Sequence, residues 1–320
     1  MKRSVPLIAA SVLLLAGCAA TPPAEDDGTI RIVASTNVYG DLAMTIGGDL
    51  VSVTSIITSA AQDPHSYEAS AQDQLALSRA DLVIENGGGY DPFIDTLLDA
   101  AGSSAVVLTA VDASRLLDDD HDHEADEADD HGTDDHAAVE HSEDDGHNHI
   151  EGFNEHVWYS LHGVEHIAEE LAHMLGELDP ANAETFDANY KAFALQIEEL
   201  EALVADIADG QGVAMTEPVP FYLLEEAGFE NKTPDAFTEA IEEGADVPPT
   251  ALLETLALFD APSVALLAYN EQTSSPETER VRAAADAASV PVVDFTETLP
   301  DGQTYLSWMR ANIEAIAAAL

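Results

Sequence analysis

The sequence is poor in cysteine and in basic residues, and both shortages limit what the chain can be. Cys18 is the only cysteine among 320 residues, so the chain must fold without internal disulfides. Ten lysines and arginines stand against 62 aspartates and glutamates, a formal net charge of −52. Nucleic-acid phosphates require basic partners, so this balance argues against nucleic-acid binding. An acidic surface also concentrates cations near the protein, which suits a cation binder.

The chain also lacks the usual catalytic patterns. The three glycines of "ENGGGYDPF" follow a predicted strand, but they do not have the spacing of a dinucleotide fingerprint. One motif has a catalytic form: "HGVEH", from His162 to His166, fits the H-x-x-E-H pattern of inverted zinc proteases, with Glu165 as general base. A five-residue match is weak in a chain with 12 histidines, and an exposed helix face explains it as well. We therefore expect a protein that is not an enzyme, with a zinc hydrolase as the least favoured alternative.

Long apolar runs are absent except at the start, "MKRSVPLIAASVLLLAGCAA". Two basic residues followed by about a dozen mostly apolar ones indicate a secretory signal that is too short to span a bilayer. The Leu-Ala-Gly-Cys pattern resembles the bacterial lipobox, in which the cysteine is diacylated after cleavage. We predict a signal peptide over residues 1–18, lipidation of Cys18, and a tether over residues 19–28. The protein is then exported and lipid-anchored to the outer face of the cell membrane; the alternative is an ordinary cleaved signal.

Beyond the tether, predicted strands such as "TIRIVAST" and "DLVIENGG" alternate with helices of 10 to 15 residues. Such alternation predicts an α/β fold with a mainly parallel sheet flanked by helices. The pattern occurs twice, in an N-terminal lobe (residues 29–180) and a C-terminal lobe (residues 210–320). One long, rigid helix over residues 181–209, about 40 Å long, is predicted to join the two lobes.

A tract over residues 118–149 interrupts the first lobe. It has almost no apolar residues to bury, so we predict a disordered, histidine- and acid-rich loop. Such a chain binds metal weakly and at interchangeable places, because each binding event orders it at an entropic cost. We expect it to capture or buffer metal; a solvated insertion without a role is the alternative. Its seven histidines are His121, His123, His131, His136, His141, His147 and His149.

Four quieter residues are better placed for a tight site. His65 in "QDPHSYE" and Glu217 in "GVAMTEP" follow predicted strands, as does Glu297 in "DFTETLP", while His156 in "FNEHVW" precedes a helix. In doubly wound sheets, ligands bind at the carboxyl ends of strands, where such loops converge. Two imidazoles and two carboxylates form a mixed N/O ligand set for a divalent transition metal.

These stretches, together with the closing "YLSWMRANIEAI", resemble the zinc/manganese solute-binding lipoproteins of ABC importers (ZnuA/TroA-like, cluster A-I). The resemblance covers about residue 29 to the end. It implies two α/β lobes that hold the metal between them, with His65, His156, Glu217 and Glu297 at the ligand positions. Most members carry an aspartate where this chain has Glu297, and Asp294 competes for that position.

The resemblance implies the biology as well. The protein is expected to be a monomer that captures a divalent metal ion and delivers it to an ABC importer permease. A histidine-rich insertion is typical of zinc members, whereas a glutamate as third ligand is common in manganese members. Zinc also binds more tightly than manganese at such sites. We therefore predict Zn²⁺ as the transported ion, with a manganese- or iron-specific importer component or a surface adhesin as alternatives.

Overall fold

The computed structural model describes residues 28–62, 64–65, 67–117, 150, 152–205, 207–260 and 263–320. The predicted signal peptide, Cys18 and the histidine-rich tract lie outside these residues. Within the described chain, no helix combines the length and the apolar character needed to cross a bilayer.

The first lobe is a four-stranded sheet with the order β2-β1-β3-β4, in which all neighbouring strands are parallel. Both faces of its central strand β1 are buried: Ile32 and Ala34 contact one core, and Val33 contacts another. Burial on both faces explains why the strand is a nearly continuous apolar run rather than an alternating one. The elements in chain order are β1 (Ile30–Thr36), α1 (Asn37–Gly47), the 3-10 helix η1 (Gly48–Leu50), β2 (Val51–Ile57), α2 (Ala71–Leu77), β3 (Leu82–Glu85), α3 (Phe93–Ala101), β4 (Val106–Thr109) and α4 (Ala110–Ser114).

The second lobe repeats this topology. Its sheet has the order β6-β5-β7-β8, again with parallel neighbours, so the two sheets share one winding although no sequence repeat is evident. The predicted α/β class with two lobes is therefore confirmed. The elements are β5 (Gly212–Met215), α8 (Phe221–Glu226), β6 (Glu230–Asn231), α9 (Asp235–Glu242), α10 (Pro249–Ala257), β7 (Leu266–Asn270), α11 (Pro276–Ala288), β8 (Val292–Phe295) and α12 (Tyr305–Ala319).

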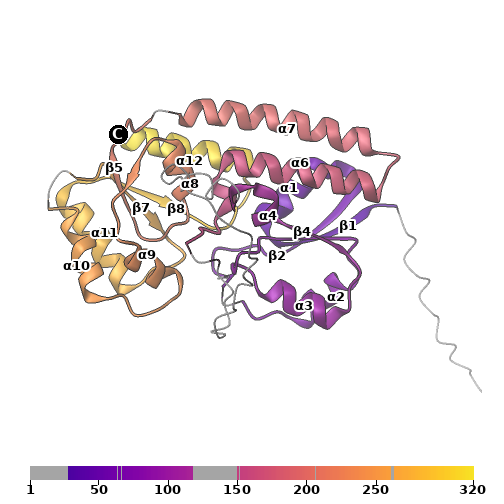
Figure 1. The fold of residues 1–320 in the computed structure, drawn as a ribbon, viewed down its shortest axis with the longest axis horizontal. Helices are drawn as coiled ribbons and strands as arrows, with labels where there is room; N and C mark the ends of the chain where they lie inside the picture. Colours follow the sequence, from indigo (N-terminus) through magenta and orange to yellow (C-terminus); the bar gives the residue numbers. More distant parts are fainter. Residues whose placement is uncertain are drawn as a thin grey trace, which may run out of the picture.

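Between the sheets the chain forms the short 3-10 helix η2 (Val157–Tyr159) and two long helices, α6 (Leu161–Leu178) and α7 (Ala183–Val204). Figure 1 shows α7 lying along both lobes, with α6 and α12 beneath it. A single apolar core runs from β1 through α6 and α7 to α12, so side-chain packing as well as the helix itself joins the lobes.

The connecting helix is shorter than predicted: it has 22 residues and ends at Val204 instead of Asp209. The following residues hydrogen-bond to the second lobe instead. Ala208 N donates to Ala227 O at 2.8 Å, and Gly210 N donates to Gly228 O at 2.9 Å. These tertiary hydrogen bonds replace the helical ones, so the helix stops about one turn early.

Candidate metal site between the lobes

Two histidines and a glutamate meet where the carboxyl ends of both sheets face each other. One ligand atom from each of His65, His156 and Glu242 lies within 4.8 Å of the others. His65 follows β2, His156 precedes η2, and Glu242 ends α9. Two imidazoles and a carboxylate from both lobes thus offer a mixed N/O ligand set that could hold a metal ion.

The ring of His156 is held in one orientation. It is fully buried, and its Nδ1 lies 2.7 Å from Asn154 Oδ1. The amide of Asn154 is itself fixed, because its Nδ2 donates to Pro218 O at 2.9 Å. Since Asn154 therefore presents its oxygen, Nδ1 of His156 carries the hydrogen and Nε2 keeps the lone pair. Such a partner fixes the tautomer of a metal-binding imidazole and orients it.

An aromatic wall backs the two histidines. The ring centroid of Tyr90 lies 5.0 Å from that of His65 and 5.7 Å from that of His156. Trp158 packs 5.1 Å from His156 and 4.7 Å from Tyr90. These buried rings restrict the imidazole rotamers, so the site is largely preformed.

Glu217 and Glu297 are both buried next to this cluster. The side-chain amide of Asn270, at the end of β7, donates to both carboxylates. Glu217 also accepts from the Thr273 hydroxyl, and Glu297 Oε2 accepts from the Tyr90 hydroxyl at 3.1 Å. The bond from Tyr90 crosses from the first lobe to the second and places Glu297 beside the aromatic wall.

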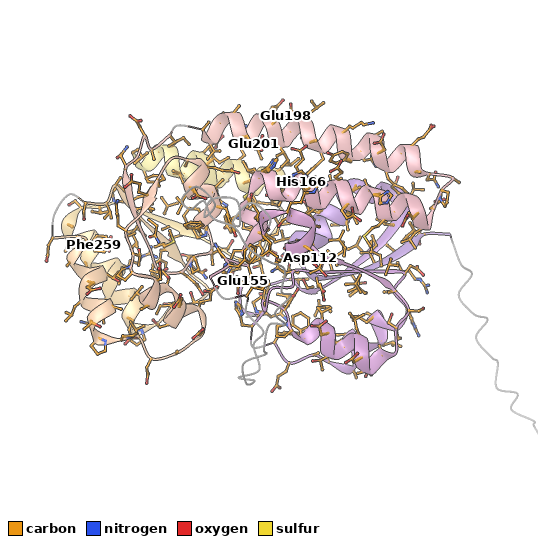
Figure 2. All side chains as sticks on the ribbon, viewed as in Figure 1. Asp112, Glu155, His166, Glu198, Glu201 and Phe259 are labelled. Atoms are coloured by element: carbon orange, nitrogen blue, oxygen red, sulfur yellow. The ribbon has the colours of Figure 1, made fainter. Side chains whose placement is uncertain are left out.

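Glu242 carries a large electrostatic perturbation. Burial is the main cause that raises its pKa from 4.5 to about 10, and the nearby carboxylates of Glu155, Glu217 and Glu297 contribute to the same shift. Its Oε1 is 3.6 Å from His156 Nδ1 and accepts no hydrogen bond within the described chain. Figure 2 shows Glu155 at the centre of the molecule, between the lobes. Four acidic side chains around two histidines strongly favour a cation, which would take the place of the proton on Glu242.

The structure thus brings His65 and His156 together with Glu242, and Asn270 joins Glu217 and Glu297 close to them. Asp294, the competitor of Glu297, is exposed on β8 and binds Arg282 through an Nη1–Oδ1 contact of 2.7 Å. Glu242 was missed because α9 was not predicted, although buried Phe237, Ala240 and Ile241 share its inner face at helical spacing. That pattern, placed after Pro234, was a signal that could have located the helix.

The H-x-x-E-H motif lies elsewhere. His162, Glu165 and His166 are on α6, where His162 and Glu165 group with Glu201 of α7 rather than with the residues of the cleft.

Comparisons with known proteins agree with this architecture. The sequence model of the ZnuA family, described as zinc-uptake complex component A, periplasmic, matches residues 32–319. The manganese-binding lipoprotein MntA of Halalkalibacterium halodurans is 24% identical over 318 residues, covering 96% of this chain and 95% of MntA. The manganese ABC transporter substrate-binding lipoprotein PsaA of Streptococcus pneumoniae is 24% identical over 331 residues, covering 97% and 96%.

Solved structures share the fold. The periplasmic zinc binding protein TroA from Treponema pallidum superimposes with a TM-score of 0.67 at 20% identity, covering 91% of this chain and 99% of TroA. A crystal structure of ZnuA gives a TM-score of 0.65 at 19% identity, covering 91% and 98%.

Proposed function

We propose, since the chain belongs to the ZnuA family of metal-uptake components, that it captures one divalent transition metal ion in the cleft and passes it to an importer permease. The observation that carries this proposal is the convergence of His65, His156 and Glu242 from the two lobes, with ligand atoms within 4.8 Å of one another.

The family consists of substrate-binding components of metal ABC transporters. The resemblance predicted from the sequence is confirmed, and the chain is a solute-binding protein rather than an enzyme. A permease partner and a divalent metal ion are therefore expected.

We assign the inner ligands to His65, His156, Glu242 and Glu297. Glu297 is chosen because Tyr90, whose ring contacts both histidines, also donates to its carboxylate. Glu217 was expected to be a ligand, and we now propose a supporting role for it. Its carboxylate accepts from Asn270 and Thr273 and adds negative charge beside Glu242.

Zinc is the ion that we propose as cargo. Two imidazole nitrogens and carboxylate oxygens suit zinc, which binds more tightly than manganese at nearly any such site. The seven-histidine tract supports zinc as well, since imidazole-rich segments favour it over manganese. Manganese is the second candidate, because the ligand set includes two carboxylates and because MntA and PsaA are named for manganese.

A deletion strain grown in chelated medium tests both the transport function and the ion. Wild-type protein should restore zinc uptake and growth with added zinc, and a variant with His65→Ala and His156→Ala should restore neither. His173→Ala, which removes an exposed histidine on α6, serves as the control and should behave as wild type. Rescue by manganese but not by zinc would overturn the choice of ion. Full rescue by the double variant would overturn the site.

The attachment of the protein is also a proposal. The Leu-Ala-Gly-Cys pattern and the lipoprotein names of relatives support diacylation of Cys18 and a position on the outer face of the cell membrane. We further propose that the mature protein is monomeric and that the tract over residues 118–149 delivers captured metal to the cleft. Cys18→Ser should release the protein from the membrane fraction; retention of the variant there would contradict lipid anchoring.

A further inference from the structure

A second group of metal-binding side chains lies on the helices that cover the lobes, and the transport function does not use it. His162 and His166 are one turn apart on α6, and their Nε2 atoms are only 3.2 Å from each other. Their ring centroids are 4.5 Å apart. Both imidazoles therefore direct the same nitrogen toward one point.

Carboxylates complete the group from two helices. Glu165 lies on α6 between the histidines, and Glu201 approaches from α7. One ligand atom each from His162, Glu165 and Glu201 lies within 4.8 Å of the others. In Figure 2 the labelled Glu201 and His166 lie on these neighbouring helices. The hydroxyl of Tyr190 on α7 donates to Glu165 Oε1 at 3.4 Å, which positions that carboxylate.

We propose that His162, His166, Glu165 and Glu201 form a second divalent metal site, which takes an ion of the zinc class and is separate from the cleft. Two nitrogens bound to one tetrahedral zinc ion at about 2.0–2.1 Å are about 3.3 Å apart. The observed separation of 3.2 Å is close to this value. Glu165 and Glu201 are the residues that we assign to the remaining positions, because each has a ligand atom within 4.8 Å of one on His162.

The environment keeps the group ready for a cation. His162 is exposed, so an ion can reach it from solvent. Burial lowers the pKa of His166, and nearby Arg115 and His162 contribute to the same shift. Burial is the main cause that raises the pKa of Glu201, and the charge of Glu165 adds to the shift.

The same helix supplies a comparison. His173 and Glu177 form an ordinary exposed i,i+4 pair with an Nε2–Oε1 distance of 3.6 Å. This pair belongs to no metal-binding group within the described residues. The alternative is that the 3.2 Å distance is an ordinary histidine–histidine hydrogen bond on a solvated surface. In that case zinc should protect His162 and His166 from modification no more than it protects His173.

The test is site-resolved protection of histidines in the full chain. Wild-type protein is modified with diethyl pyrocarbonate across a series of chelator-buffered free zinc concentrations, and modification at each histidine is measured by peptide mass spectrometry. His162 and His166 should be protected together with one midpoint, while His173 stays reactive over the same range. Protection should persist in a variant with His65→Ala and His156→Ala, because the cleft is a different site.

Variants of the carboxylates sharpen the test. Removing a residue that binds the ion directly should weaken zinc binding at least as much as removing a residue that only supports a ligand. Glu165→Gln and Glu201→Gln should therefore each raise the free zinc concentration at half protection by about tenfold or more. Glu177→Gln makes the same change in charge on α6, the helix of Glu165, and should leave the midpoint unchanged. The proposal is wrong if His162 and His166 respond like His173, or if neither glutamine variant shifts the midpoint. The comparison with His173 is made within wild-type protein, so it holds even if a variant folds poorly.

Discussion

Replacing Glu242 with glutamine should change how the stability of the metal-free protein depends on pH. Burial and neighbouring carboxylates raise the pKa of Glu242 from its ordinary 4.5 to about 10. Below pH 4.5 the group is protonated in both the folded and the unfolded chain. Above that value the unfolded chain ionises it while the folded chain keeps the proton, so the wild type loses stability as pH rises toward 10.

The size of the effect follows from the linkage. One pH unit in this window costs about 1.4 kcal/mol, so the wild type should lose about 2 kcal/mol by pH 6 and about 5 kcal/mol by pH 8. The amide of Glu242→Gln has nearly the shape of the protonated carboxyl and cannot ionise, so the variant avoids this loss. The free-energy difference between variant and wild type should therefore grow by about 3 kcal/mol between pH 6 and pH 8.

Urea unfolding in excess chelator, followed by far-UV circular dichroism at pH 6, 7 and 8, measures this difference. The matched control is Glu243→Gln, because Glu243 is the next residue but exposed; its curves should run parallel to the wild type. With added zinc, the wild type should have the higher free energy of unfolding, since it keeps the carboxylate that binds the ion. If the free energies of unfolding of Glu242→Gln and wild type change in parallel with pH, Glu242 does not keep its proton in the folded state.

Three further predictions concern the metal. His65→Ala and His156→Ala should each weaken metal binding by several kcal/mol in a competition titration, whereas His162→Ala should keep the tight site in the cleft. Loss of tight binding in His162→Ala, with tight binding kept in His65→Ala, would refute the site. Asn154→Ala should weaken metal binding by about 10- to 100-fold, because it removes the acceptor that fixes the His156 tautomer; an unchanged affinity would contradict that role. Deleting residues 118–149 should preserve the fold and the binding of one tight metal ion, but remove the additional, weakly bound metal ions seen by titration calorimetry. Loss of the tight binding would show that the tract supplies an inner ligand.

The sequence was sufficient for the class of fold because the relevant signals are local. Apolar runs such as Ile30–Thr36, followed by amphipathic helices, predict parallel strands wherever they occur along a chain. Stretches such as the one around His65 could be identified for the same reason, since polar residues just after strands gather at one edge of a parallel sheet. The end of α7 was predicted wrongly because hydrogen bonds from Ala208 and Gly210 to the second lobe, and not local propensity, stop the helix there.

By itself, then, the sequence indicated the two-lobed α/β architecture and identified His65, His156, Glu217 and Glu297 as candidate ligands. Only the tertiary structure decided which side chains meet. It brought Glu242 to the histidines and turned Asp294 outward to Arg282. It also placed Glu201 against the histidine pair of α6. A metal site depends on angstrom-scale distances between residues far apart in the chain, and those distances arise from packing of the lobes and helices, which no local pattern encodes.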